Sequence, residues 1–201
     1  KLFPAIVSLH LLGGYVLLAL LAWQAAQAWH RDSGNLPAGV SIGLRRSVWL
    51  ALVMLFAQAA SGAWVSTNYA VLACTEFPQC QGGWWPAMDF AQGFELWRPL
   101  GLGSQGEPIS FQALTAIHFA HRLLAGFTIL VLGAVVLRLW NTKVLHRATR
   151  LLAALLALQV ITGVSNVVLG WPLLAAVLHT GGAGAMLAVL VWMLAITQHT
   201  N

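Results

Sequence analysis

The segment Phe111–Trp140 (FQALTAIHFAHRLLAGFTILVLGAVVLRLW) decides the fold, because it exceeds the ~20 helical residues that cross a membrane core. Four further stretches share its apolar character: Leu2–Trp29, Val48–Val71, Leu151–Gly170 and Trp171–Thr197. The chain of 201 residues is 59% hydrophobic and 7% charged, whereas soluble domains carry about 25% charged residues. We therefore predict an all-α polytopic protein with five transmembrane helices, the last four forming an antiparallel four-helix bundle.

Charged residues gather in the segments between these stretches. Residues 30–46 and 141–150 are mainly basic, whereas residues 72–110 hold four carboxylates against Arg98 alone. Short basic loops stay cytoplasmic, so we predict a cytoplasmic linker at 30–46 and an outer loop at 72–110. The net charge of +5 is then an orientation signal and no sign of nucleic-acid binding. The last four apolar segments contain no Asp or Glu, which argues against a proton-pumping path through them.

The first segment has two interpretations. Ala26-Gln27-Ala28 imitates a cleavage site, so residues 2–29 resemble a long signal peptide. Arg45 and Arg46 would then lie on the wrong side of the membrane. We expect instead that this segment is a transmembrane helix and that the chain is the C-terminal part of a longer protein.

Three histidines, His10, His121 and His179, each lie a few residues inside the start of an apolar segment. The predicted orientation makes these three segments cross the membrane in the same direction. Ionisable side chains at membrane depth are rare and usually face a bundle interior or a ligand. His121 and His179 match in depth within about one turn (~5.4 Å), and facing bundle helices build cofactor sites. The pair either holds the iron of a porphyrin or bridges helices by hydrogen bonds.

Two neighbours of His121 have open roles. His118 lies on the same helix face, where it is an alternative iron ligand, a partner for a haem propionate, or a headgroup-region residue. Arg122 either pairs with a propionate or reaches to the membrane interface. We expect Gly181, Gly182 and Gly184 to leave room for a flat macrocycle.

Cys74 and Cys80 are the only cysteines, in the loop ACTEFPQC that follows the second apolar segment. Five intervening residues with a proline allow the sulfurs to meet, and an outer compartment is oxidising, so a disulfide is plausible. A zinc site is the weaker alternative, because two ligands do not close one. A disulfide here would be either a structural staple or a redox-active pair. We expect the rest of the loop to cover the outer end of the bundle.

Two patterns recur along the chain. Leu9-His10 is followed by two glycines and, thirteen residues after the histidine, by Trp23; Leu178-His179 is followed by two glycines and, thirteen residues on, by Trp192. Gln58-Ala59-Ala60-Ser61-Gly62 also matches Gln159-Val160-Ile161-Thr162-Gly163. These matches favour an internal duplication, in which small residues let helices approach closely.

Several stretches together resemble the second half of haem A synthases. They are Gly62–Thr67 (GAWVST), Ala73–Cys80 (ACTEFPQC), Ile117–Arg122 (IHFAHR), Gln159–Asn166 (QVITGVSN) and Ala176–His179 (AVLH). In this resemblance residues 1–29 match the last helix of the N-terminal, substrate-binding half. Residues 47–201 match the C-terminal four-helix half.

The resemblance implies an oxidoreductase that converts the C8 methyl group of haem O to a formyl group with water-derived oxygen, for cytochrome oxidase assembly. His121 and His179 match the ligands of a haem b, and His10 matches a ligand of the substrate haem O. The cysteines match a pair that the family has in this loop, which supports a Cys74–Cys80 disulfide. The family's catalytic glutamate has no counterpart, and His118 stands at the equivalent place, so this chain is expected to bind haem b without making haem A alone.

One alternative is a stand-alone membrane b-type cytochrome that carries electrons between quinol and another acceptor. A second is a haem-free bundle in which the histidines only bridge helices. Candidate partners are the lipid bilayer, haem O synthase, an electron acceptor and a second copy of the chain. The expected location is a bacterial cytoplasmic membrane or a mitochondrial inner membrane.

Overall fold

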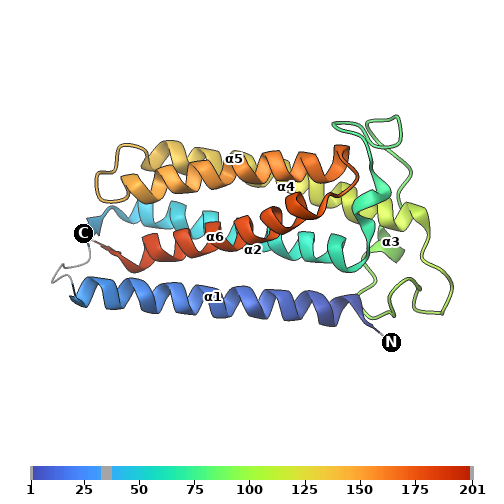
Figure 1. Cartoon of the computed structure of the whole chain (residues 1–201), viewed down its shortest axis with the longest axis horizontal. Coiled ribbons are helices and arrows are strands. Elements are labelled where there is room, and N and C mark those ends of the chain that lie inside the picture. The colour runs from blue at the N-terminus through green and yellow to red at the C-terminus, as the bar shows by residue number, and fades with distance from the viewer. Residues whose placement is uncertain (1, 33–37, 200–201) are drawn as a thin grey trace.

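The computed structural model describes residues 2–32 and 38–199, which form five long helices (Figure 1). The helices are α1 Pro4–Asp32, α2 Ile42–Thr67, α4 Phe111–Leu139, α5 His146–Val168 and α6 Leu173–Ala195. Each of them is long and apolar enough to cross a membrane. The prediction of an all-α membrane protein with five spanning helices is confirmed.

Four of these helices form a closed ring. Helix α2 packs against α4, α4 against α5, α5 against α6, and α6 against α2. Neighbours in the ring run in opposite directions (Figure 1). Helices α4 and α6 therefore occupy opposite corners, with α2 and α5 between them.

Helix α1 lies outside the ring, against α6 and α2. Its Tyr15 hydroxyl donates to the Thr180 carbonyl on α6 at 2.8 Å. Gly184 on α6 allows this close approach, since a Cβ there would lie 3.3 Å from Leu18 Cδ2 and 3.5 Å from Tyr15 Cε1. The hydroxyls of Ser8 and Thr67 join α1 to α2 at 3.0 Å.

Two helices begin earlier than the apolar pattern predicts. Helix α2 begins at Ile42 instead of Val48 because the Ser41 hydroxyl accepts from the Leu44 N–H at 3.3 Å and caps it. Helix α5 begins at His146 instead of Leu151. Because the first turns of both helices contain charged residues, a prediction based on hydrophobicity places the helix starts too late. Part of the predicted linker 30–46, residues 33–37, lies outside the described residues.

The ends of the ring away from the large loop are joined by a feature that the sequence did not predict. Strand β1, Ala38–Val40, pairs in parallel with strand β2, Thr197–His199. Arg45 supports this junction by donating to the carbonyls of Leu194, at 3.0 Å, and Thr197. Arg138 donates to the Ser47 hydroxyl at 3.0 Å nearby. We call this the basic end and the opposite one the loop end.

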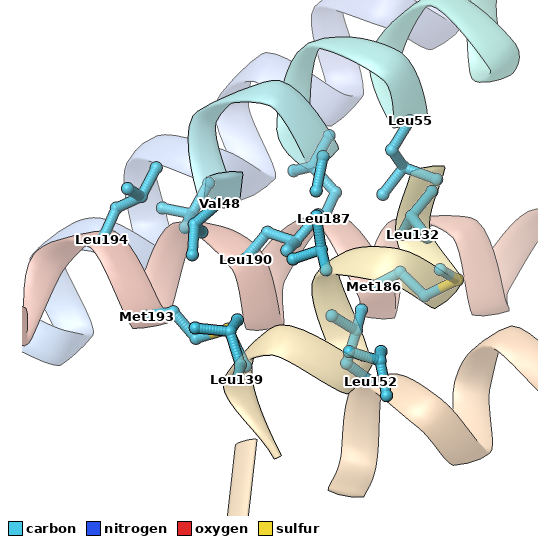
Figure 2. Close-up of a cluster of buried hydrophobic side chains, with 14 of the residues drawn as sticks. Val48, Leu55, Leu132, Leu139, Leu152, Met186, Leu187, Leu190, Met193 and Leu194 are labelled. Atoms are coloured by element: carbon cyan, nitrogen blue, oxygen red, sulfur yellow. The ribbon is translucent and has the colours of Figure 1, made fainter. Parts of the chain in front are cut away.

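The half of the ring nearer the basic end is filled by buried aliphatic and methionine side chains from all four helices (Figure 2). This solid half contains Val48, Leu55, Leu132, Leu139, Leu152, Met186, Leu187, Leu190, Met193 and Leu194. Leu139, Leu190 and Met193 are fully buried. Between membrane helices, association rests mainly on van der Waals packing, and the direct contacts among these side chains supply such packing to this half of the ring.

The loop end is covered by residues 68–110, which include the 3₁₀ helix η1, Ala70–Ala73, and the short helix α3, Phe90–Gly93. The centre of the loop is the fully buried side chain of Arg98. Its guanidinium donates to Asn68 Oδ1 at 2.6 Å and to the Leu102 carbonyl at 3.2 Å. Burial lowers the pKa of Arg98, and nearby Glu95 opposes this shift. The expected cover over the end of the bundle is present.

Candidate functional site

A cavity of about 430 Å³ occupies the half of the ring nearer the loop end. Leu55, Leu132 and Met186 form its floor toward the solid half, and Val71 and Phe77 of the loop also line it. Ligand pockets in proteins are typically about 300–1,000 Å³ and mainly apolar. The ring is thus solid at one end and hollow at the other.

Three of the predicted site histidines meet at this cavity. His118 and His121 of α4 and His179 of α6 all line it. His118 is only 3% exposed, and the other two are partly buried. Because α4 and α6 stand at opposite corners of the ring, His121 and His179 approach the cavity from two sides. This arrangement suits two ligands on opposite faces of one planar group.

His121 is held by the neighbouring helix α2. The Ser61 hydroxyl lies 2.8 Å from His121 Nδ1. The amide nitrogen of Gln58 lies 3.1 Å from Nδ1 and 3.3 Å from Nε2 of the same ring. Gly62 gives the ring its space, because a Cβ there would lie 3.1 Å from His121 Cε1.

His179 is held in the same way by helix α5. The Thr162 hydroxyl lies 3.0 Å from His179 Nδ1, and a Cβ at Gly163 would lie 3.1 Å from His179 Cε1. Gln159 begins this pentad as Gln58 begins the other. The repeated pentads, Gln58–Gly62 and Gln159–Gly163, are therefore two equivalent supports, each on the helix that precedes its histidine.

The polar atoms around the cavity favour a ligand with polar groups of its own. Six buried side-chain nitrogen or oxygen atoms have no hydrogen-bond partner in the described part of the chain, and five belong to residues that line the cavity. These five are Gln58 Oε1, His118 Nδ1, Thr128 Oγ1, Gln159 Nε2 and Asn166 Oδ1. Buried polar groups are normally hydrogen-bonded. An apolar chamber with two opposed imidazoles and unpaired polar atoms fits haem, a planar macrocycle with polar edges.

A bare metal ion fits the residues less well. Among residues 2–32 and 38–199, no group of three or more His, Cys, Asp or Glu side chains is placed to hold a metal ion. His121 and His179 alone leave two of the four positions of a tetrahedral metal site unfilled. A porphyrin supplies four nitrogen ligands itself, so two imidazoles suffice for it.

Arg122 has partners that the sequence did not suggest. Its guanidinium donates to the carbonyls of Glu76 and Pro78, both at 2.9 Å, and of Gln79 at 3.2 Å. It also stacks over the Phe77 ring, 5.3 Å from the centroid. Arg122 thus holds the loop that covers the cavity, and it lines the cavity as well.

The loop that Arg122 contacts contains the predicted disulfide. Cys74 and Cys80 are bonded to each other, which confirms the pairing. Both cysteines are fully buried. The segment from Cys74 to Cys80, which the disulfide closes into a loop, contains the three carbonyls to which Arg122 donates.

His10 lies apart from this cavity. It is on an exposed face of α1, whereas the α1 residues that line the cavity are Leu11 and Tyr15. The structure therefore separates His10 from His121 and His179, which share one site.

The glycines expected to make room for a macrocycle have other neighbours. A Cβ at Gly182 would collide with the Gln159 amide, and Gly184 faces α1. The glycines that line the cavity are Gly62, Gly126 and Gly163. The expectation was wrong for Gly182 and Gly184 because close contact with a helix or a side chain, and not the cavity, requires their lack of a Cβ.

Sequence reasoning overlooked the support residues. The pentads were visible as a repeat, but only their small residues were given a role, in helix packing, and their polar members were given none. The available signal was the hydroxyl directly before a glycine in both copies, Ser61-Gly62 and Thr162-Gly163. Such a pair presents a hydrogen-bonding group beside a space without a side chain.

Comparison with known proteins gives one family. The family model described as cytochrome oxidase assembly protein, COX15-CtaA, matches residues 1–191. A heme A synthase from Shewanella oneidensis is 37% identical over 194 residues, which cover 95% of this chain and 58% of the relative.

More distant relatives agree. A heme A synthase from Cereibacter sphaeroides is 31% identical over 92% of this chain and 46% of its own length. Another, from Halalkalibacterium halodurans, is 29% identical over 87% of this chain and 53% of its own length. The chain thus spans about half the length of the curated relatives that it matches.

Proposed function

Because this chain belongs to the COX15-CtaA family of cytochrome oxidase assembly proteins, we propose that it supplies the haem b half of a haem A synthase. The observation that carries the proposal is the pair of imidazoles, His121 and His179, on opposite corners of one cavity. In this proposal residues 47–201 are the haem b domain, and residues 1–29 are the last helix of the substrate-binding half.

The reaction of the complete enzyme would be oxidation of the C8 methyl group of haem O to a formyl group, with oxygen derived from water. When bound, haem b would accept and pass on single electrons. His121 and His179 would present one nitrogen each to its iron. His118, with its Nδ1 buried and unpartnered on the same face of α4, would donate to a propionate.

The substrate haem O would bind elsewhere. His10 lies on an exposed face of α1, outside the ring, and would be one of its iron ligands. The cavity residues of the ring include no carboxylate, so the ring offers no equivalent of the family's catalytic glutamate. The described chain would therefore hold haem b without producing haem A.

We propose the bacterial cytoplasmic membrane as the location, with residues 72–110 on the outer side. The basic end carries Arg45, Arg138 and the segment 143–150, as expected for a cytoplasmic face. The disulfide at the loop end suits an oxidising compartment. Haem O synthase, an electron acceptor and a second copy of the chain are proposed partners.

The test is the absorption spectrum of the purified protein in detergent. We expect a reducible low-spin b-type band that is lost in His121→Ala and in His179→Ala. His146→Ala, at the basic end, is the matched control and should keep the band. An unchanged band in either ligand variant would contradict the pairing. Loss in His118→Ala with retention in His121→Ala would place the ligand one turn away.

A further inference from the structure

The two support pentads hold their histidines through hydroxyl groups with the same local geometry. Ser61 Oγ lies 2.8 Å from His121 Nδ1, and Thr162 Oγ1 lies 3.0 Å from His179 Nδ1. Neither helix needs a side-chain hydroxyl at this position to form in a membrane, because the backbone N–H and C=O groups of a helix bond to one another. Their pairing with the two site histidines is therefore informative.

The hydrogen of each hydroxyl is already committed. Ser61 Oγ donates to the Gln58 carbonyl at 2.8 Å, and Thr162 Oγ1 donates to the Leu158 carbonyl at 2.8 Å. A hydroxyl has one hydrogen and two acceptor lone pairs. Each oxygen therefore has a lone pair with which to accept from its histidine, and this contact places the hydrogen on Nδ1. At His121 the Gln58 amide nitrogen, 3.1 Å from Nδ1 and 3.3 Å from Nε2, can then donate to Nε2.

This arrangement favours the same tautomer in both rings. In a neutral imidazole one nitrogen is a donor and the other an acceptor. With the hydrogen on Nδ1, the free lone pair of His121 and of His179 is on Nε2. A ligand histidine that donates its other N–H to an acceptor is oriented by it and becomes more basic.

We propose that Ser61 and Thr162 are positioning residues, which present Nε2 of His121 and of His179 to the haem iron and lower the midpoint potential of the haem. The proposal rests on the proposed function, since it concerns the same haem. A more basic imidazole favours ferric over ferrous iron, so removal of either hydroxyl should raise the potential.

Each support has a second contact beside its hydroxyl. The Gln58 amide also reaches the His121 carbonyl oxygen, at 3.4 Å, and can keep this contact when iron takes Nε2. The Gln159 amide instead lies beside Gly182. His179 has the backbone carbonyl of Gln159 as a second partner beside Thr162, so each ring has one further contact on its supporting helix. We expect Thr162→Val and Ser61→Ala to raise the potential alike.

The experiment compares Thr162→Val and Ser61→Ala with Thr162→Ser, which restores a hydroxyl. Thr149→Val is the matched control, because Thr149 is also buried on α5 and donates to the carbonyl four residues earlier, Leu145, at 2.9 Å. Haem occupancy is measured from the reduced-minus-oxidised spectrum, the potential by redox titration, and the ring orientation by electron paramagnetic resonance of the ferric state.

We expect Thr162→Val to lower haem affinity about 10- to 100-fold, the usual effect of losing such a partner. Each 10-fold loss of ferric preference raises the potential by about 59 mV for this one-electron couple. Thr162→Ser and Thr149→Val should behave like the wild type. If Thr162→Val does not fold, the midpoint potential of Ser61→Ala tests the positioning role.

Two failures are distinguishable. Wild-type potentials and spectra in both Thr162→Val and Ser61→Ala would overturn the positioning role while the haem itself remained bound. An equal shift in Thr149→Val would also overturn it, because the effect would then be general. Absence of haem from the wild type, or its retention in His121→Ala and His179→Ala, would instead contradict the proposed function.

Discussion

Gly163 on α5 stands directly behind the imidazole of His179 on α6, so that a Cβ at position 163 would lie 3.1 Å from Cε1. Gly62 has the same relation to His121, also at 3.1 Å. Ordinary van der Waals contact begins at about 3.4 Å for such atoms. A methyl group at either position therefore requires the imidazole to shift by a few tenths of an ångström.

We predict that Gly62→Ala and Gly163→Ala each weaken haem binding by about 10-fold or more, through displacement of the ligand ring. The helices themselves should not suffer, since Ala is favoured over Gly in a helix by about 0.8–1 kcal/mol. Haem titration of the apoprotein measures the loss. Gly133→Ala on α4 is the control, because a Cβ there meets nothing within 4 Å. Wild-type affinity in both variants would show that the rings have room to move.

Removal of the Arg122 guanidinium should loosen the disulfide loop. In Arg122→Met the carbonyls of Glu76, Pro78 and Gln79 lose their shared donor. We expect faster amide hydrogen exchange in residues 74–83, measured by mass spectrometry, while exchange within the solid half is unchanged. Arg138→Met at the basic end should leave residues 74–83 as they are. Unchanged exchange in Arg122→Met would mean that the disulfide alone holds the loop.

The buried guanidinium of Arg98 should be necessary for the cover of the loop end. Arg98→Met keeps the aliphatic volume but leaves Asn68 Oδ1 buried without its donor, at a cost of about 1–3 kcal/mol. Limited proteolysis of residues 95–110 should accelerate, with the helices intact. Arg31→Met, an exposed arginine of α1, is the comparison. Equal proteolysis of Arg98→Met and the wild type would contradict this role.

A larger side chain at Gly184 should separate α1 from the ring. In Gly184→Val the new methyl groups meet Leu18 and Tyr15, and overpacking of this kind costs about 1–3 kcal/mol. The Tyr15–Thr180 hydrogen bond should be lost as well. Denaturation in detergent measures the change, with Gly181→Ala as control, since a Cβ at Gly181 has no neighbour within 4 Å. A haem band that survives in Gly184→Val would show that the ring does not need α1.

The fold was predictable because each spanning segment is an uninterrupted apolar run, and its length alone indicates a membrane helix. The starts of α2 and α5 were not predictable, since Arg45, Arg46 and Arg147 resemble loop residues although they lie in the first two turns of these helices. The pairing of β1 with β2 joins segments more than 150 residues apart. Three residues per strand carry no pattern that reveals such a contact.

The sequence was enough to bring His121 and His179 to one site, but not to identify the side chains around them. Depth along a helix can be counted from the sequence, so His121 and His179 could be paired before the ring order was known. The partners of Arg122 depend on how the disulfide loop folds back over α4, which no local pattern encodes. The roles of Ser61 and Thr162 depend on the rotation of neighbouring helices, which the apolar pattern leaves open because lipid-facing and core-facing residues are both hydrophobic.

The division of the ring into a solid and a hollow half bears on the order of assembly. The side chains that join α2, α4, α5 and α6 at the basic end touch one another and need no ligand between them. The four helices can therefore associate while the cavity is empty, and in the proposed function haem would bind afterwards. Apoprotein should accumulate as an inserted, stable species, and haem supply would then limit its maturation without limiting its survival in the membrane.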